Sequence, residues 1–286
     1  MKMMPFLLHV LSPLHAGTGQ AADVIDLPIA RMKATGIPFV PGTSIKGVLR
    51  DACGRIDIEK TEAIFGTADA EAAHAGALVV GDARLLALPV RSFKGTFAWT
   101  SSPLLLVLAQ RDLATALPIP SFQSRGAKVA PGPACIHNGR LYLEDLDLPA
   151  EESAELAQWA EMLAPVVSPG EDIFTKRFSI VDDDTMAFLS ETATQVDARV
   201  RLSERTRTVE RGALWLEESL PPETLLIGLL AAESSRAQKV KMDPDEVLEF
   251  ALTGNEAVQL GGKATTGHGR CRLIPVPQAG AADVRR

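Results

Sequence analysis

The sequence predicts an α+β fold, built on an elaborated ferredoxin-like or RRM-like sheet that carries a long insertion. A strand–helix–strand pass can be followed near each end of the chain, and the pattern loosens between them, from about 118 to 180. Proline, glycine and acidic residues are frequent in that stretch, so we interpret it as a largely irregular insertion. The whole chain, 1–286, is then expected to form a single domain.

The first pass opens with a buried strand over 5–11 (PFLLHVL), which a Ser-Pro pair ends. Thr43-Ser44, directly after a Pro-Gly bend, is a helix N-cap signal, and apolar residues at helical spacing follow it. The pattern then predicts three more elements: a short helix over 60–65 that stops at Gly66, a strand over 77–88 bulged at Gly81, and a helix over 102–116.

The second pass follows the insertion, in which an acidic helix is expected near 150–164. A β-ribbon over 196–216 leads into a buried strand over 224–232 (TLLIGLLAA), and a helix over 243–253 precedes a last strand over 269–276.

Composition limits the class of protein. Hydrophobic residues make up 46% of the chain and the mean hydropathy is +0.09, which is enough for a sizeable core. No apolar run is long enough to cross a membrane, and the N-terminus lacks the features of a signal peptide. The three cysteines are far apart and form no CxxC, so neither disulfides nor a zinc site are indicated. We therefore expect a cytoplasmic protein.

The charge is unevenly distributed. A net charge of −7 taken alone argues against binding to nucleic acid, because phosphate contacts need positive potential. Yet residues 199–211 (RVRLSERTRTVER) hold five arginines against two glutamates. All five arginines occupy odd positions, which in an extended strand places them on one face. This ribbon is a candidate contact for a polyanion.

Two glycine-rich segments partly match nucleotide-binding motifs. The first, 17–22 (GTGQAA), matches the loose dinucleotide pattern, but β-branched residues and a proline follow it where a helix should begin, so we predict a tight turn. The second, 261–270 (GGKATTGHGR), lacks the glycine and hydroxyl residue of a P-loop. It is either a simple turn or a loop whose N–H groups, Lys263 and Arg270 face phosphates.

Asp26 is the candidate reactive carboxylate. Pro28 keeps the chain extended there, and the basic residues around it in the sequence, from Arg31 to Arg50, would keep the acid ionised. It could accept a proton or hold a hydrated Mg²⁺, or it could be an ordinary turn residue. Lys46 and Arg50 share one face of the first helix, either as a phosphate contact or as a solvated surface. His15 could likewise be structural or catalytic.

Several segments in this order resemble the RAMP superfamily of CRISPR proteins. They are HAGTG, VIDLPIAR, TGIPFVPGTSIKGVLRD, IFGT, GDARLLALPVRSFKGTFAWTSSPLLL and LGGKATTGHGRCRL. The chain looks most like the repeated backbone subunit of Cmr (type III-B) effector complexes, and SFKGTFAWTSSP favours this over the Csm relative. The resemblance covers both ends and the middle of the chain and is weak over 118–180.

This resemblance implies an RRM-like palm with a β-hairpin thumb within about 181–222. Copies of the chain would assemble along a crRNA with other Cmr subunits and without contact to a membrane. The thumb would displace a nucleotide at regular intervals of the guide–target duplex.

The resemblance also assigns roles to residues. Asp26 falls on the family's catalytic aspartate for cleavage of target RNA, which would leave a 2′,3′-cyclic phosphate and a 5′-OH, with Mg²⁺ or Mn²⁺ held weakly. The implied RNA-binding residues are His15, Lys46, Arg50, Arg199, Arg201, Lys263, His268 and Arg270. Two other hypotheses stay open: a non-catalytic RNA scaffold, and a related RAMP protein such as a Csm-type backbone or a guide-processing nuclease that uses His15.

Overall fold

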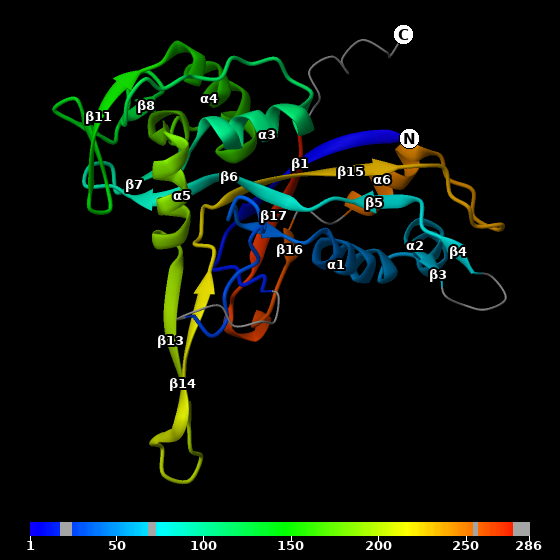
Figure 1. Cartoon of the computed structure of the whole chain (residues 1–286). Coiled ribbons are helices and arrows are strands. Elements are labelled where there is room, and N and C mark those ends of the chain that lie inside the picture. Colours follow the sequence, from blue (N-terminus) through cyan, green and yellow to red (C-terminus); the bar gives the residue numbers. More distant parts are fainter. Residues whose placement is uncertain (18–24, 68–72, 254–256, 277–286) are drawn as a thin grey trace.

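A large mixed sheet forms the centre of the computed structural model, which describes residues 1–17, 25–67, 73–253 and 257–276 except for the side chain of Arg211 (Figure 1). In sheet order its strands are β16 (Ala257–Gln259), β17 (Arg270–Pro275), β1 (Lys2–Val10), β15 (Leu225–Ala232), β6 (Ala83–Arg91), β7 (Phe97–Ser101), β12 (Phe178–Val181), β8 (Ala127–Val129), β11 (Leu146–Glu152), β10 (Arg140–Leu143) and β9 (Ile136–His137). β2 (Phe39–Val40) also pairs with β6, and β5 (Leu78–Val80) pairs with β15. The α+β class predicted from the sequence is confirmed.

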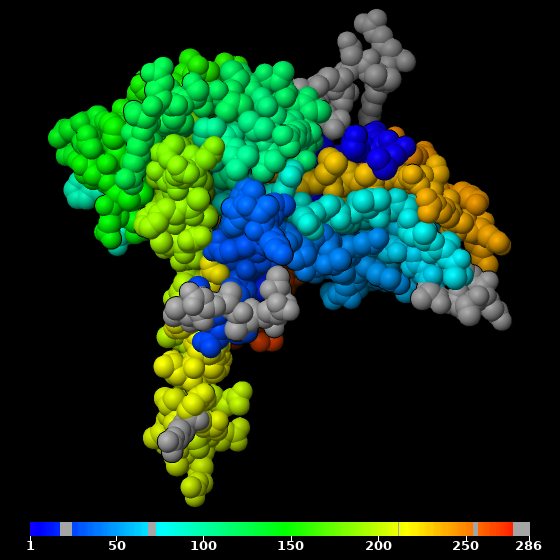
Figure 2. Space-filling model, in the orientation of Figure 1, coloured from blue at the N-terminus to red at the C-terminus, as the bar shows by residue number. Residues whose placement is uncertain are grey.

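A two-stranded hairpin projects from this body (Figures 1 and 2). It consists of β13 (Gln195–Leu202) and β14 (Val209–Ser219), which confirms the ribbon predicted over 196–216. One face of the hairpin carries exposed aliphatic side chains: Val196, Val200, Leu202, Val209 and Leu214, which are 44–65% exposed. Large apolar side chains are seldom gathered on one exposed face of a protein, so this face is unusual.

The arginines of the ribbon follow the predicted parity only where the chain is extended. Arg199 and Arg201 lie in β13 and point to the same face, opposite to the aliphatic side chains. Arg205 and Arg207 lie in the connection between the strands, where Arg207 has a φ of 59° and the alternation no longer applies. The side chain of Arg211 lies outside the described residues.

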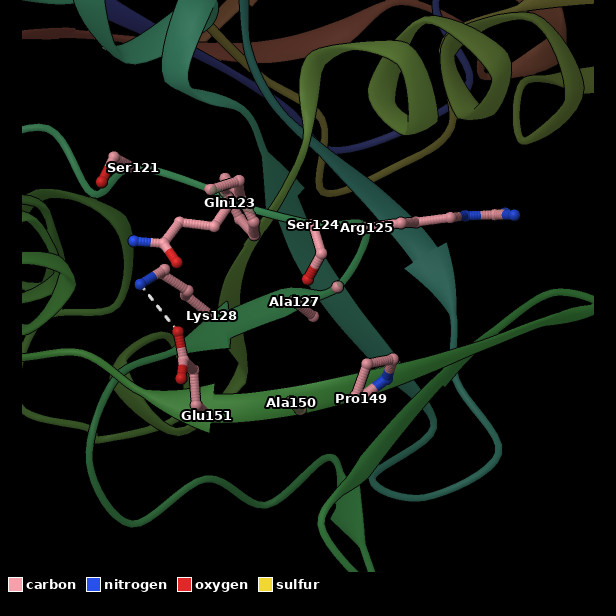
Figure 3. A pocket seen from close by; sticks show the side chains of 11 residues that line it. Ser121, Gln123, Ser124, Arg125, Ala127, Lys128, Pro149, Ala150 and Glu151 are labelled. Atoms are coloured by element: carbon pink, nitrogen blue, oxygen red, sulfur yellow. Dashed lines mark ion pairs between the residues drawn. The ribbon is translucent and has the colours of Figure 1, made fainter.

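The stretch expected to be largely irregular is more regular than predicted. Between 118 and 180 it contains β8 to β12 and the helix α4 (Ala154–Val167), which confirms the acidic helix. These strands are short, and they are stabilised by partners that are distant in the sequence, such as Ser179 opposite Val129. Loop 121–126 and the ends of β8 and β11 border a cavity of about 520 Å³, where Lys128 pairs with Glu151 at 2.8 Å (Figure 3).

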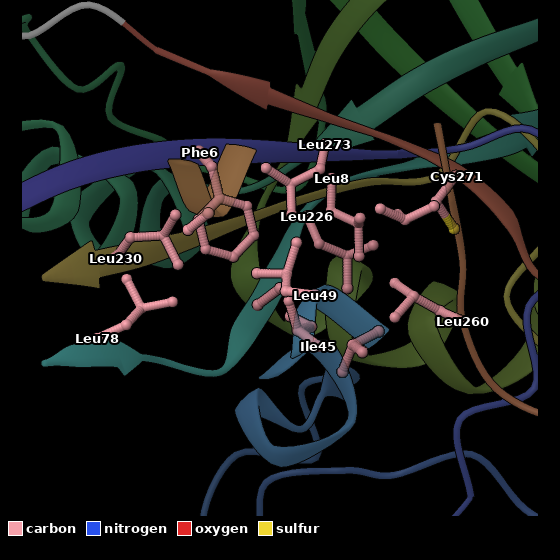
Figure 4. Close-up of a cluster of buried hydrophobic side chains, with 14 of the residues drawn as sticks. Phe6, Leu8, Ile45, Leu49, Leu78, Leu226, Leu230, Leu260, Cys271 and Leu273 are labelled. Atoms are coloured by element: carbon pink, nitrogen blue, oxygen red, sulfur yellow. The ribbon is translucent and has the colours of Figure 1, made fainter. Parts of the chain in front are cut away.

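The core lies on both faces of the sheet. Even-numbered residues of β1, such as Phe6 and Leu8, pack with Ile45 and Leu49 of α1 (Gly42–Gly54) (Figure 4). Leu7 points to the other face, into a second cluster that includes side chains of α3 (Pro103–Leu113) and α4. β1 is therefore buried on both faces, as its continuous apolar run predicts.

The remaining elements complete the list: α2 (Ile58–Phe65), α5 (Asp183–Thr192), α6 (Pro244–Leu252), two 3₁₀ turns at Thr175–Arg177 and Ala264–Thr266, and the small pair β3 (Gly66–Thr67) and β4 (His74–Ala75). The helices predicted over 60–65, 102–116 and 243–253 are confirmed, and Gly66 ends α2 as expected. Helix α5 was not predicted.

Two local predictions are wrong in detail. Thr43 and Ser44 lie inside the first turn of α1 rather than at its cap, because Pro41 is the N-cap residue and the Gly42 N–H bonds to the Asp82 carboxylate at 2.8 Å. The strand expected over 77–88 is divided into β5 and β6. The break comes at Gly81 and Asp82, where Asp82 turns toward α1 while both strands still pair with β15.

Candidate functional site at the root of the hairpin

The segment that carries Asp26 runs beside β14 at the hairpin root, which we define as residues 195–199 and 215–219. The Leu27 N–H donates to the Leu216 carbonyl at 3.1 Å, and the Glu218 N–H donates to the Leu27 carbonyl at 3.0 Å. Leu27 and Glu217 form a parallel bridge. The segment thus adds a short third piece to the two-stranded ribbon.

Asp26 is held by one of its oxygens and remains exposed. Its Oδ2 accepts a hydrogen bond from the Leu216 N–H at 2.7 Å. Leu214, the most exposed aliphatic side chain of the hairpin face, lies two residues farther out along β14. The carboxylate is therefore fixed in position, open to a bound molecule, and placed where the hairpin leaves the body of the protein.

The carboxylate of Glu218 connects β14 with two other parts of the chain at this root, the segment 29–31 and Thr194. Its carboxylate is 2% exposed and accepts three hydrogen bonds: from the Ile29 N–H at 3.0 Å, from Arg31 at 2.5 Å and from the Thr194 hydroxyl at 2.8 Å. Arg31 also donates to the Ser190 carbonyl at 2.9 Å. Buried charges are stable when they are paired and hydrogen-bonded in this way.

His15 is bound to the same residue. Its Nδ1 lies 2.7 Å from the Glu218 carbonyl oxygen. A carbonyl oxygen can only accept, so Nδ1 carries the proton. This contact gives His15 a structural role at the root, beside the RNA-binding role that its sequence position implies.

Glu217 faces the opposite side of β14 and pairs with the glycine-rich loop. Its carboxylate, 1% exposed, forms an ion pair with Lys263 and lies 3.6 Å from Arg199 Nε. Arg199 also approaches Asp197 at 3.4 Å and His268 Nε2 at 3.2 Å. Lys263 and Arg199, both predicted to meet RNA phosphates, are thus already next to an internal counter-charge.

The pKa of His268 is lowered by burial and by the nearby positive charges of Arg199 and Lys263. Arginine can only donate hydrogen bonds, so its contact with Nε2 requires a neutral imidazole whose proton is on Nδ1. The lowered pKa and the hydrogen bond are therefore consistent with each other.

The glycines of loop 261–269 are of two kinds, those where a side chain would clash and those that face open space. Gly261 and Gly269 have φ angles of 70° and 78°, and a Cβ atom would lie 2.2 Å from the His15 carbonyl oxygen and 1.9 Å from that of Leu260. Only glycine fits at these two positions. At Gly262 and Gly267 a Cβ would meet no atom within 4 Å, so the outer side of the loop is open.

The other predicted residues lie elsewhere or are exposed. Lys46 donates to the Leu78 carbonyl at 3.1 Å, so this side chain contacts β5 rather than Asp26. Arg50, Arg201 and Arg270 are exposed, and no ion pair involves them within the described part of the chain. Sequence reasoning missed Glu217 and Glu218, although two adjacent acids in a strand after ALWL are a signal that one acid faces each side.

Neither a metal-binding cluster nor a membrane-spanning helix is found in the described part of the chain. Over 1–17, 25–67, 73–253 and 257–276, no group of three or more His, Cys, Asp or Glu residues is arranged to hold a metal ion. Within the same residues, no helix is long and apolar enough to span a bilayer.

The comparisons with known proteins agree with this architecture. The model of the RAMP superfamily matches residues 7–272. The Cmr endoribonuclease Cmr4 of the Pyrococcus furiosus CRISPR system is 36% identical over 280 residues, 92% of each chain. The crystal structure of oligomeric Cmr4 from that organism superposes with a TM-score of 0.73 at 26% identity and covers 97% of this chain and 99% of its own.

A more distant structure shares the fold. A chain of the type III-B Cmr-beta complex bound to cognate target RNA has a TM-score of 0.74 at 22% identity, with 96% of this chain and 98% of that chain covered. The family match spans nearly the whole sequence, and the fold superposes on solved relatives over nearly its whole length. The chain belongs to the RAMP superfamily.

Proposed function

We propose that this protein is the crRNA-binding backbone subunit of a type III-B (Cmr) effector complex and that it cleaves the complementary target RNA at regular intervals. The observation that carries the proposal is Asp26, an exposed carboxylate fixed by the Leu216 N–H at the root of a projecting hairpin. The relative of matching length bears the name of an endoribonuclease of a Cmr system, which supports the same conclusion.

RNA supplies its own nucleophile, the 2′-OH, so the protein needs to align this group and remove its proton. In an A-form duplex the 2′-oxygen is not in line with the leaving 5′-oxygen, and displacement of one nucleotide removes this constraint. The exposed aliphatic face of the hairpin, which begins close to Asp26, is suited to contact unstacked bases. Asp26 then acts as general base, and the products are a 2′,3′-cyclic phosphate and a 5′-OH.

A divalent metal fits Asp26 only as a weakly held ion. One carboxylate with a single anchored oxygen offers far fewer ligands than Mg²⁺ or Mn²⁺ requires, so water and the phosphates of the RNA would complete the coordination. When bound, such an ion lowers the pKa of the attacking group and stabilises the developing negative charge. Asp26 itself orients and deprotonates the 2′-OH.

Binding to the guide is assigned to the exposed cations of the described residues. Arg50 on α1, Arg201 on β13 and Arg270 beside the glycine-rich loop are free of ion pairs there. Lys46, Lys263 and His268, which are also predicted to bind RNA, have internal partners. We place the protein in the cytoplasm, where the buried thiols of Cys53, Cys135 and Cys271 stay reduced.

The test is Asp26→Asn in the reconstituted complex. Loss of the carboxylate should lower target cleavage by more than about 100-fold, the usual scale of general-base catalysis, while guide and target binding stay unchanged. Cleavage at the normal rate would reject the enzyme and leave an RNA scaffold. If the isolated chain cuts precursor guide RNA and His15→Ala abolishes this, the protein is a guide-processing nuclease instead.

A further inference from the structure

We propose that Glu218 is a positioning residue for Asp26, so that a buried carboxylate on β14 sets the geometry of the reactive one. This inference rests on the proposed function of Asp26. Glu218 does not offer its carboxylate to RNA, because the side chain is 2% exposed and its oxygens accept hydrogen bonds from protein donors. It acts through the segment 25–31 that carries Asp26.

Three contacts of Glu218 hold the chain directly after Asp26. The backbone N–H of Glu218 holds the Leu27 carbonyl at 3.0 Å, one residue after Asp26. The side chain holds the Ile29 N–H at 3.0 Å and Arg31 at 2.5 Å. The segment is therefore fixed at Leu27, Ile29 and Arg31, and in this placement Asp26 Oδ2 lies 2.7 Å from the Leu216 nitrogen.

The same carboxylate fixes this site to the rest of the protein. Thr194, directly before β13, donates to Glu218 at 2.8 Å, and Arg31 donates at 2.9 Å to the Ser190 carbonyl in α5. Thr194 and the segment of Asp26 thus share one buried acceptor, and Arg31 connects that segment to α5. A movement of the hairpin would be transmitted directly to Asp26.

A carboxylate is required here by the number and type of its donors. It accepts from a guanidinium, an amide and a hydroxyl at once, which a glutamine cannot do, because its NH₂ group would face one of these donors. The buried Ile29 N–H or the Arg31 guanidinium would lose its acceptor, and a buried donor without an acceptor is costly. The segment would then shift rather than keep its place.

The experiment compares Glu218→Gln with wild type in complexes that carry equal amounts of guide. The expected result is a fall of about 10- to 100-fold in the single-turnover cleavage rate at saturating target, because displacement of a catalytic group by about 1 Å has effects of this size. The target concentration at half-maximal rate should stay unchanged, and so should guide binding. Hydrogen–deuterium exchange should rise over 25–31 and stay unchanged over 201–210, the outer end of the hairpin.

Two matched variants make the result decisive. Glu161→Gln, at an exposed acid on α4 outside the hairpin, should cleave like wild type. Thr194→Val removes one of the three donors and leaves the carboxylate, so it should slow cleavage by about threefold; it replaces Glu218→Gln if that variant does not assemble. A normal rate in the assembled variant overturns the proposal, and so does an equal loss of guide binding, which would mean general misfolding.

Asp26→Asn in the same assay separates the two proposals. If Asp26→Asn abolishes cleavage and Glu218→Gln does not slow it, the positioning role fails while the proposed function stands. If Asp26→Asn cleaves normally, the proposed function itself is rejected, and the exchange data on 25–31 then report only on structure.

Discussion

The root and the tip of the hairpin have opposite surfaces. At the root, two adjacent carboxylates, Glu217 and Glu218, are buried and hold cations on both sides of β14. At the tip, which we define as residues 201–210, Arg201, Arg205 and Arg207 are exposed, and no ion pair involves them within the described residues. The charges of the root are thus neutralised within the protein, whereas the arginines of the tip are available to a partner.

This difference shows which cations can serve a polyanion. A side chain that already has a buried counter-ion must lose it before it binds a phosphate, and that loss costs free energy. Lys263 and Arg199 are in this position. The exposed arginines of the tip carry no such cost, so we expect them to be the better phosphate contacts, while the cations of the root support the fold.

The largest effect is expected from Glu217→Ala, which should lower the free energy of unfolding by about 2–3 kcal/mol. The substitution leaves Lys263 and Arg199 side by side without their shared counter-charge. The loss is smaller than for a fully buried ion pair, because the Lys263 and Arg199 side chains are each 33% exposed. Urea unfolding measures it, with Glu210→Ala as the exposed control on β14. Equal midpoints for the two variants would break the distinction between root and tip.

A smaller, purely electrostatic effect is expected at the tip. The double variant Arg205→Ala/Arg207→Ala should weaken binding of single-stranded RNA by on the order of tenfold at low salt, and reduce the slope of log K against log salt by about 1.4. Thermal stability should not change, because neither arginine supports the fold. Arg236→Ala, which removes a cation paired with Glu233, is the control and should leave the slope as it is.

The smallest effect concerns pH. The pKa of His268 is lowered below its usual 6.5, so between the folded pKa and 6.5 the unfolded chain binds more protons than the folded one. The contribution of this residue to stability is therefore fully present above pH 6.5 and is lost as pH falls through the folded pKa. His268→Gln should flatten this part of the stability profile, measured by urea unfolding between pH 7 and pH 5. An unchanged profile would place His268 outside the root network.

The elements that could be predicted are those specified by local sequence. The apolar run of β1, the Ser-Pro start of α3 and the Asp243 to Glu246 capping box of α6 each determine their element within a few residues. Helix α5 was missed because its start, DDDT, looks like a polar loop; in the structure Asp182 caps the helix by accepting from the Thr185 N–H. The strands of the insertion depend on distant partners, which local patterns do not contain.

The same distinction applies to the site. Asp26 could be selected from a family resemblance and its proline context, and its role stays a prediction. The surroundings expected from sequence were less accurate, because closeness in sequence was taken as closeness in space: Lys46 contacts β5, while the residue that holds the segment of Asp26 is Glu218, far along the chain. Buried acids cannot be recognised from composition, which indicates only that most acids are exposed.

The exposed aliphatic face of the hairpin also affects the solubility of the free subunit. A free subunit presents Val196, Val200, Leu202, Val209 and Leu214 to water on a ribbon with open edges, which is a surface prone to aggregation. In the proposed complex, synthesis of this chain in excess over guide RNA and neighbouring copies would therefore favour aggregation. Balanced production of protein and RNA would then serve solubility as well as function.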